Sequence, residues 1–294
     1  IFNGVEVEEN SFAEMFPAWA GRFLITAVNE KWAWMAAEAT VGFATTTILC
    51  PVEAGVERMV QPSETPDGRP GVLVQIYHRD RWKLKEQMVT RLGQCVLTCP
   101  TTAAFDALPE AVRRLYVGRR LRYFGDGFQR KDVMFGRNVW RIPVMDGEFI
   151  VEDKFGAKMG IAGGMFLIFA ENQKMGLRAA ERAVEAMRRV NNVILPFPGG
   201  ICRSGSKVGS IKYPHLKSVR ASTNEPYCPT IKGKVASTMI PDNVTSVYEL
   251  VLDGLTLNSV KEAMAAGIKA ASSMQGIIKI KAADYGGKLG PYKL

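Results

Sequence analysis

One pattern of strands and helices occurs twice in the chain, and it constrains the fold more than any single motif. In the first half, residues 22–28 are rich in Phe, Leu and Ile and predict a buried strand. Asn29 is a suitable N-cap for a helix at 31–41, where apolar residues recur at helical spacing. A β-branched run at 45–50 predicts a second strand, which Pro51 ends.

The second half repeats this order at nearly the same spacing. Residues 165–169 predict a strand, Asn172 opens a turn, and 177–189 form a strongly amphipathic helix pattern. A strand at 193–195 ends at Pro196. Asn172 lies 143 positions after the asparagine of the first half, and Pro196 lies 145 positions after the corresponding proline. The match is one of pattern, with little residue identity between the halves.

In each half, this first strand, helix and strand are followed by a second strand, helix and strand. The predicted segments are 72–77, 83–92 and 96–98 in the first half, and 247–252, 257–271 and 277–280 in the second. The order β-α-β-β-α-β favours an antiparallel sheet with two helices on one face. We therefore predict an α+β fold of two ferredoxin-like (split βαβ) lobes with long inserted loops, an N-terminal lobe at 1–145 and a C-terminal lobe at 146–294.

Composition is that of a basic globular protein. Of 294 residues, 47% are hydrophobic, and 38 Lys and Arg face 29 Asp and Glu, for a net charge of +9. Disordered and collagen-like classes are excluded. Such a charge suits anionic partners, although it can also serve solubility alone.

The cysteines and the N-terminus bear on the compartment and on metals. Five cysteines without a framework spacing indicate a reducing compartment, and with only two histidines a tetrahedral metal site is not expected. Acidic residues stand where a signal peptide would be basic, and the longest uncharged apolar run is too short to span a membrane. We expect a soluble, cytoplasmic protein.

A glycine-rich run follows the strand at 193–195. Gly199 and Gly200 precede Lys207 in a segment whose backbone N–H groups could cradle an anion. The spacing is not that of a Walker loop. The alternative is a loop whose glycines supply positive φ angles.

A second loop, at 221–230, concentrates hydroxyl and amide groups between prolines. Ser222, Thr223 and Asn224 are its candidate polar contacts to a carbonyl or a pterin-like ring. The alternative is an ordinary Asx or Ser/Thr turn.

Glu249 is the sharpest single candidate for chemistry. In the strand 247–252, alternation places it on one face with Val247 and Val251, among apolar neighbours. Desolvation raises the pKa of such a carboxyl, and a raised pKa suits general acid–base catalysis. The alternative is a structural glutamate held in a salt bridge.

Residues 113–141 hold nine basic side chains, and only Asp126 and Asp132 oppose them within the stretch. Binding of phosphate or polycarboxylate, docking of an acidic subunit, and a nucleic-acid surface are all open, as is a solvated basic face.

These segments together resemble the formylmethanofuran:tetrahydromethanopterin formyltransferase family, over essentially the whole chain. The runs that carry the resemblance are KWA (31–33), ETPDGRPG (64–71), GQCVLTCPTTA (93–103), FGDG (124–127), FIVED (149–153), PFPGG (196–200), ASTN (221–224), YCPT (227–230) and GGKLG (286–290). Several independent runs in order make the resemblance specific.

The resemblance implies a formyltransferase that moves a formyl group between formylmethanofuran, or methylofuran, and a ring amine of tetrahydromethanopterin. It implies no metal and no prosthetic group, because both coenzymes are substrates. The family's proposed catalytic carboxylate lies in a Val-Tyr-Glu run, which matches residues 247–249 and assigns the role to Glu249. We expect substrate contacts from Gln94, Gly199, Gly200, Lys207, Ser222, Thr223 and Asn224.

The resemblance also implies a homo-oligomer, a dimer or a tetramer, and in methylotrophic bacteria a complex with formyl hydrolase subunits. Residues 113–141 would then receive a glutamate chain of the furan coenzyme or dock a partner. Two alternatives remain, a non-catalytic structural subunit of a one-carbon enzyme complex and an RNA-binding ferredoxin-like protein. We expect neither nucleic acid nor membrane as a partner.

Overall fold

The computed structural model divides into two compact units. It describes residues 3–8, 13–205, 224–282 and 290–293. The first unit contains Ala18–Thr47 and Pro51–Gly160, and the second contains Ile1–Pro17, Ile48–Cys50 and Ile161–Leu294. Two long strands, β2 (Glu14–Thr26) and β10 (Phe155–Ala170), run along the chain from one unit into the other.

Strands of the first unit form a mixed sheet. Their order is β3 (Glu53–Val60), β4 (Gly71–His78), β2, β5 (Ala103–Asp106), β9 (Gly147–Glu152), β8 (Arg137–Val144) and β7 (Arg130–Met134). Neighbours are antiparallel except β5 and β9. The remaining elements are α1 (Glu30–Val41), α2 (Arg81–Arg91), a π-helical turn at Leu92–Val96, β6 (Arg113–Leu115) and α3 (Val117–Leu121), with 3-10 turns at Pro62–Glu64 and Arg122–Gly125.

Local signals explain where α1 begins and what it covers. Asn29 is extended, and its side chain accepts a hydrogen bond from the Trp32 backbone N at 3.1 Å, which caps the helix as predicted. The buried face of α1, which includes Ala33 and Ala36, packs with Phe23 of β2 in the core of this unit. The small alanines allow the helix to lie close to the sheet.

Two strands predicted in the first half are wrong. Residues 45–50 form turns, because the Thr47 N–H bonds to the Glu53 carboxylate at 3.0 Å instead of to a neighbouring strand. Residues 96–98 belong to the π-helical turn and the turn after it, where the Thr98 hydroxyl donates to the Gln94 carbonyl at 2.7 Å. The strand of this region is β5, which begins five residues after the end of the predicted segment.

The second unit has its own sheet of mixed direction. The order is β1 (Glu6–Val7), β13 (Ile277–Ala282), β10, β12 (Ser246–Gly254) and β11 (Val193–Ile194), with only β1 and β13 parallel. β14 (Tyr292–Lys293) pairs with the start of β2. The helices are α4 (Gln173–Met187) and α5 (Leu257–Ser272), and 3-10 turns lie at Pro198–Gly200, Glu225–Tyr227 and Pro229–Lys234.

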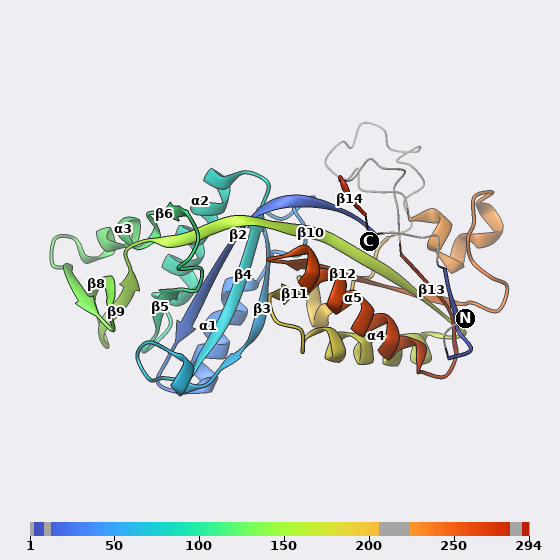
Figure 1. Ribbon diagram of the computed structural model, residues 1–294, viewed down its shortest axis with the longest axis horizontal. Helices are drawn as coiled ribbons and strands as arrows, with labels where there is room; N and C mark the ends of the chain where they lie inside the picture. The colour runs from blue at the N-terminus through green and yellow to red at the C-terminus, as the bar shows by residue number, and fades with distance from the viewer. Residues whose placement is uncertain (1–2, 9–12, 206–223, 283–289, 294) are drawn as a thin grey trace. The chain divides into compact units, whose positions relative to one another are not determined.

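Helices α4 and α5 lie side by side and cover one face of the second sheet (Figure 1). Asn172 and Thr256 cap them, accepting from backbone N–H groups at 3.0 and 3.1 Å. Their apolar faces bury Phe166 of β10 and Leu250 of β12. The chain is thus a mixed α/β protein. Within the described residues, no helix is long and apolar enough to cross a membrane.

Candidate active site

Strand β12 has two unlike faces, as its alternation predicts. Tyr248 and Leu250 pack into the core beneath α4 and α5. Val247 and Val251 turn the other way and pack in a smaller cluster around Leu167 of β10. Glu249 pairs with Leu167 in the register of β10 and β12, so it lies on this second face, away from the helices.

A short extended segment runs beside Glu249. The Cys202 N–H donates to the Glu249 carbonyl at 2.8 Å, and the Glu249 N–H donates to the Cys202 carbonyl at 3.3 Å. In the preceding turn, Gly199 has a φ of 64° and Gly200 a φ of 84°. These positive angles fit the alternative interpretation of the run, a loop in which glycines supply positive φ angles. A Cβ on Gly200 would lie 2.9 Å from Cγ1 of Val184. The two glycines therefore turn the chain back along β12.

The carboxyl of Glu249 is held by this segment. The Ser204 hydroxyl donates to its Oε2 at 2.5 Å, and the Ser204 oxygen lies 3.4 Å from the Cys202 sulfur. Burial raises the pKa of the Glu249 carboxyl, while hydrogen bonds from Ser204 and Cys202 oppose the shift. Burial and the nearby carboxylate raise the pKa of the Cys202 thiol to about 12. The cluster therefore pairs an exchangeable proton on Glu249 with a thiol that stays protonated.

A cavity of about 260 Å³ opens in front of this carboxyl, within the second unit. Met165, Leu167 and Val247 supply an apolar part of its wall. Its hydroxyl and amide groups come from Ser204, Asn224, Tyr227, Thr230, Thr245 and Ser246. An apolar wall with a few convergent polar groups and a carboxyl of raised pKa is the usual composition of a small-molecule site.

Glu249 is not a salt-bridged glutamate within the part of the chain that the structure describes. Its side-chain partners there are a hydroxyl and a thiol, and it forms no ion pair. Arg203 lines the same cavity. The carboxyl can therefore gain or lose its proton without breaking a charge pair.

Apart from Gly199 and Gly200, which lie in the turn before Cys202, the other predicted site residues fall in three places. Asn224 lines the cavity with Glu249. Gln94 belongs to the first unit, where it is exposed in the π-helical turn. Lys207, Ser222 and Thr223 lie outside the described residues.

Ser204 and Cys202 are functional candidates that the sequence reasoning missed. Because the segment after Gly200 is extended, residues two apart point to the same side. The side chains of Cys202 and Ser204 therefore lie on the same side of the segment. The available signal was the pattern Gly-Gly-x-Cys-x-Ser, but only its pairing with β12 brings it to Glu249.

Ion pairs neutralise five of the nine basic side chains in the stretch 113–141. Most of the acidic partners lie outside the stretch. The ion pairs are Arg114–Asp106, Arg119–Asp153, Arg130–Glu148, Arg137–Glu152 and Arg141–Asp132. Four cations of the stretch form no ion pair among the described residues, namely Arg113, Arg120, Arg122 and Lys131. Because no described acidic residue neutralises these four side chains, they are the candidates of the stretch for binding an anion.

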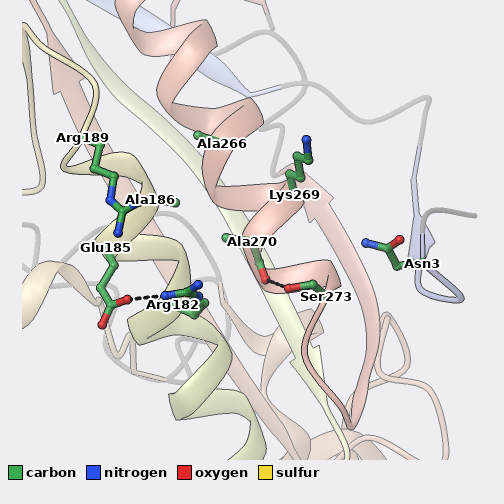
Figure 2. Close-up of a pocket in the computed structure, with 9 residues that line it drawn as sticks. All are labelled: Asn3, Arg182, Glu185, Ala186, Arg189, Ala266, Lys269, Ala270 and Ser273. Atoms are coloured by element: carbon green, nitrogen blue, oxygen red, sulfur yellow. Dashed lines mark hydrogen bonds and ion pairs between the residues drawn. The ribbon is translucent and has the colours of Figure 1, made fainter.

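A larger hollow, about 450 Å³, lies between α4 and α5 (Figure 2). Its charged side chains are exposed, and Arg182 pairs with Glu185 at 2.9 Å. It offers no desolvated acid or base, so the chemistry points to the smaller cavity at Glu249. No group of three or more His, Cys, Asp or Glu side chains in the described residues could hold a metal ion.

Two family models together match almost the entire chain. The model described as formylmethanofuran-tetrahydromethanopterin formyltransferase matches residues 1–144, and the model described as FTR, proximal lobe, matches residues 147–294. The formylmethanofuran–tetrahydromethanopterin formyltransferase of Methanocaldococcus jannaschii is 53% identical over 292 residues, covering 99% of this chain and 96% of the relative. That of Methylobacillus flagellatus is 50% identical over 298 residues, covering 99% and 97%.

Two solved structures are similar along their full length. The formyltransferase from Methanosarcina barkeri superposes with a TM-score of 0.94 at 51% identity, covering 100% of this chain and 98% of that one. A chain of the formyltransferase/hydrolase complex from Methylorubrum extorquens, in complex with methylofuran, gives 0.92 at 42% identity, covering 99% and 96%. The chain belongs to the formylmethanofuran–tetrahydromethanopterin formyltransferase family, and it is an enzyme of the transferase class.

Proposed function

We propose that this chain transfers a formyl group directly between a methanofuran-type coenzyme and the ring amine of a tetrahydromethanopterin-type coenzyme, with Glu249 as the acid–base residue. Both coenzymes are substrates held together in a ternary complex. The observation that carries the proposal is the Glu249 carboxyl, which is hydrogen-bonded by Ser204 at the wall of a cavity and has a raised pKa. Relatives named for this transfer reaction at 50–53% identity support the choice of substrates.

The reaction needs a group that moves one proton. The pterin amine attacks the formamide carbon, a C–N bond forms, and the carbonyl oxygen becomes an oxyanion. The attacking nitrogen loses its proton to the Glu249 carboxylate. The resulting carboxylic acid then protonates the furan nitrogen, which leaves with the electron pair of its C–N bond and restores the carboxylate. A carboxyl with a raised pKa suits both halves of this exchange.

The polar wall of the cavity supplies what the oxyanion requires. Asn224 is the predicted contact that shares the cavity with Glu249. An amide N–H aimed at the developing charge would lower the barrier, and holding both reactants in one site would lower it further. We keep Gln94, Gly199, Gly200, Lys207, Ser222 and Thr223 as proposed substrate contacts.

We further infer two ferredoxin-like lobes, divided at about residues 145–146. The strand order β5-β2-β4-β3 in the first unit supports this, since a split βαβ fold places its four strands in that order. The order β13-β10-β12-β11 in the second unit supports it equally.

We also propose that this chain binds other protein subunits. The chain from Methylorubrum extorquens belongs to a formyltransferase/hydrolase complex, which supports association of this chain with hydrolase subunits. We propose a homo-oligomer, a cytoplasmic location, and a role for Arg113, Arg120, Arg122 and Lys131 in meeting an anionic coenzyme chain or partner. Reversing the charges of Arg120 and Arg122 tests this role without breaking the Arg119–Asp153 ion pair, and unchanged affinity with unchanged complex formation would remove it.

The decisive assay mixes purified protein with N-formylated furan coenzyme and reduced pterin and follows formylated pterin by absorbance. We expect turnover by the wild-type chain. Glu249→Gln should fold and bind both coenzymes while losing two to four decades of turnover, which is the usual size of an acid–base contribution. Absence of transfer by folded wild-type protein would favour a structural subunit instead.

A further inference from the structure

Glu249 is held from one side by two donors on a single short segment. Ser204 donates its hydroxyl to Oε2 at 2.5 Å, and the thiol of Cys202 also hydrogen-bonds to the carboxyl. The two donors are in contact with each other at 3.4 Å. The segment itself is fixed to β12 by the two backbone hydrogen bonds between Cys202 and Glu249. The carboxyl and its donors therefore lie on two backbone segments that are hydrogen-bonded to each other.

We propose that Ser204 is a positioning residue of the transfer reaction, whose hydroxyl clamps the Glu249 carboxylate and sets the pH at which it accepts a proton, with Cys202 as a second, weaker donor. The inference rests on the proposed function of Glu249.

Two opposing effects set the charge of the Glu249 carboxyl. Burial disfavours the charged form of a carboxyl, so without a donor Glu249 would hold its proton up to a higher pH and would be a less available base. A hydrogen bond donated to the carboxylate favours the charged form and offsets part of that cost. Ser204 supplies this bond without adding a charge, so the carboxyl remains able to give the proton back.

Among the described residues, no side chain at the cavity other than Ser204 and Cys202 is hydrogen-bonded to the Glu249 carboxyl. The titratable or charged residues that line it with Glu249, among the described residues, are Cys202, Arg203, Tyr227 and Cys228. β10 contributes only Met165 and Leu167, which are apolar. Cys202, with its pKa of about 12, stays a neutral thiol. It can donate a weak hydrogen bond, but it does not compete for the proton.

The test compares Ser204→Ala with Ser204→Thr, which keeps the hydroxyl, in two measurements. The first is kcat/KM for formyl transfer against pH. The second is the titration of Glu249 in the free protein, followed by carbon-13 NMR of labelled glutamate and assigned by its loss in Glu249→Gln. We expect Ser204→Ala to raise both midpoints by about one pH unit, because loss of a donor to a carboxylate raises its pKa.

On the acid limb, kcat/KM would fall about tenfold in Ser204→Ala, since each unit of pKa changes the carboxylate fraction tenfold there. The test rests on the position of the midpoints and not on the height of the plateau. Ser204→Thr should restore both midpoints, which a loss of packing alone would not reproduce. Cys202→Ala should move both midpoints in the same direction by less, and it tests the clamp independently if Ser204→Ala fails to fold.

The outcomes separate this inference from the proposed function. Unmoved midpoints in folded Ser204→Ala or Cys202→Ala would overturn the clamp, even if Glu249→Gln is inactive. A shifted Glu249 titration with an unshifted rate profile would keep the effect of Ser204 on the carboxyl, but it would overturn Glu249 as the group whose proton the reaction needs, and with it the positioning role.

Discussion

The turn that brings Ser204 beside Glu249 offers a matched pair of glycine substitutions. Gly199 and Gly200 both have positive φ, at 64° and 84°, and each costs about 1–2 kcal/mol to occupy with a residue that has a Cβ. A Cβ on Gly199 meets nothing within 4 Å, whereas one on Gly200 lies 2.9 and 3.1 Å from the two methyl groups of Val184. Overpacking of this kind adds about 1–3 kcal/mol.

Gly200→Ala should therefore lower the free energy of unfolding by about 2–5 kcal/mol, and Gly199→Ala by only about 1–2 kcal/mol. Urea-induced unfolding of the two variants and the wild type, monitored by circular dichroism, measures the difference. Equal losses, or a larger loss for Gly199→Ala, would refute the close approach of the turn to Val184 of α4.

Three further predictions concern single side chains. The Cys202 thiol, buried and with a pKa of about 12, should resist iodoacetamide at pH 8 in the native protein and react after unfolding, as mass spectrometry of the modified peptide would report. Glu57→Ala should cost about 3–5 kcal/mol in urea unfolding, since it leaves Arg22, 2.8 Å from the carboxylate, and the buried Gln75 without their acceptor. Asn224→Ala should lower kcat/KM at least about two- to tenfold, the size of one hydrogen bond, and an unchanged kcat/KM in steady-state kinetics would remove Asn224 from the contacts.

Local signals in the sequence were sufficient for most helices and for the faces of β12. Asn29 and Asn172 cap α1 and α4 because an Asx side chain at an extended residue bonds to the backbone three positions on, which is a purely local event. The alternation of β12 predicts that Glu249 shares a face with Val247 and Val251, and only the structure shows that this face lies away from α4 and α5.

What could not be predicted depends on pairing between distant residues. The run 45–50 has strand propensity, but Thr47 bonds to Glu53 instead of to a neighbouring strand. Ser204 is 45 residues from Glu249, and only the turn at Gly200 and the pairing with β12 bring them together. Long-range pairing of this kind leaves no periodic signal in the sequence, so the donors of the carboxyl were missed.

The central claim is that the Glu249 carboxyl carries the proton during direct formyl transfer. The most direct test is the rate of formyl transfer to reduced pterin as a function of pH, for wild type and Glu249→Gln side by side. Because burial raises the pKa of this carboxyl, the wild-type rate should rise with pH through a midpoint above the ordinary glutamate value of 4.5, as the carboxylate forms. The glutamine variant should be slower by two to four decades and lack that rise, whereas a wild-type rate and profile in folded Glu249→Gln would contradict the claim.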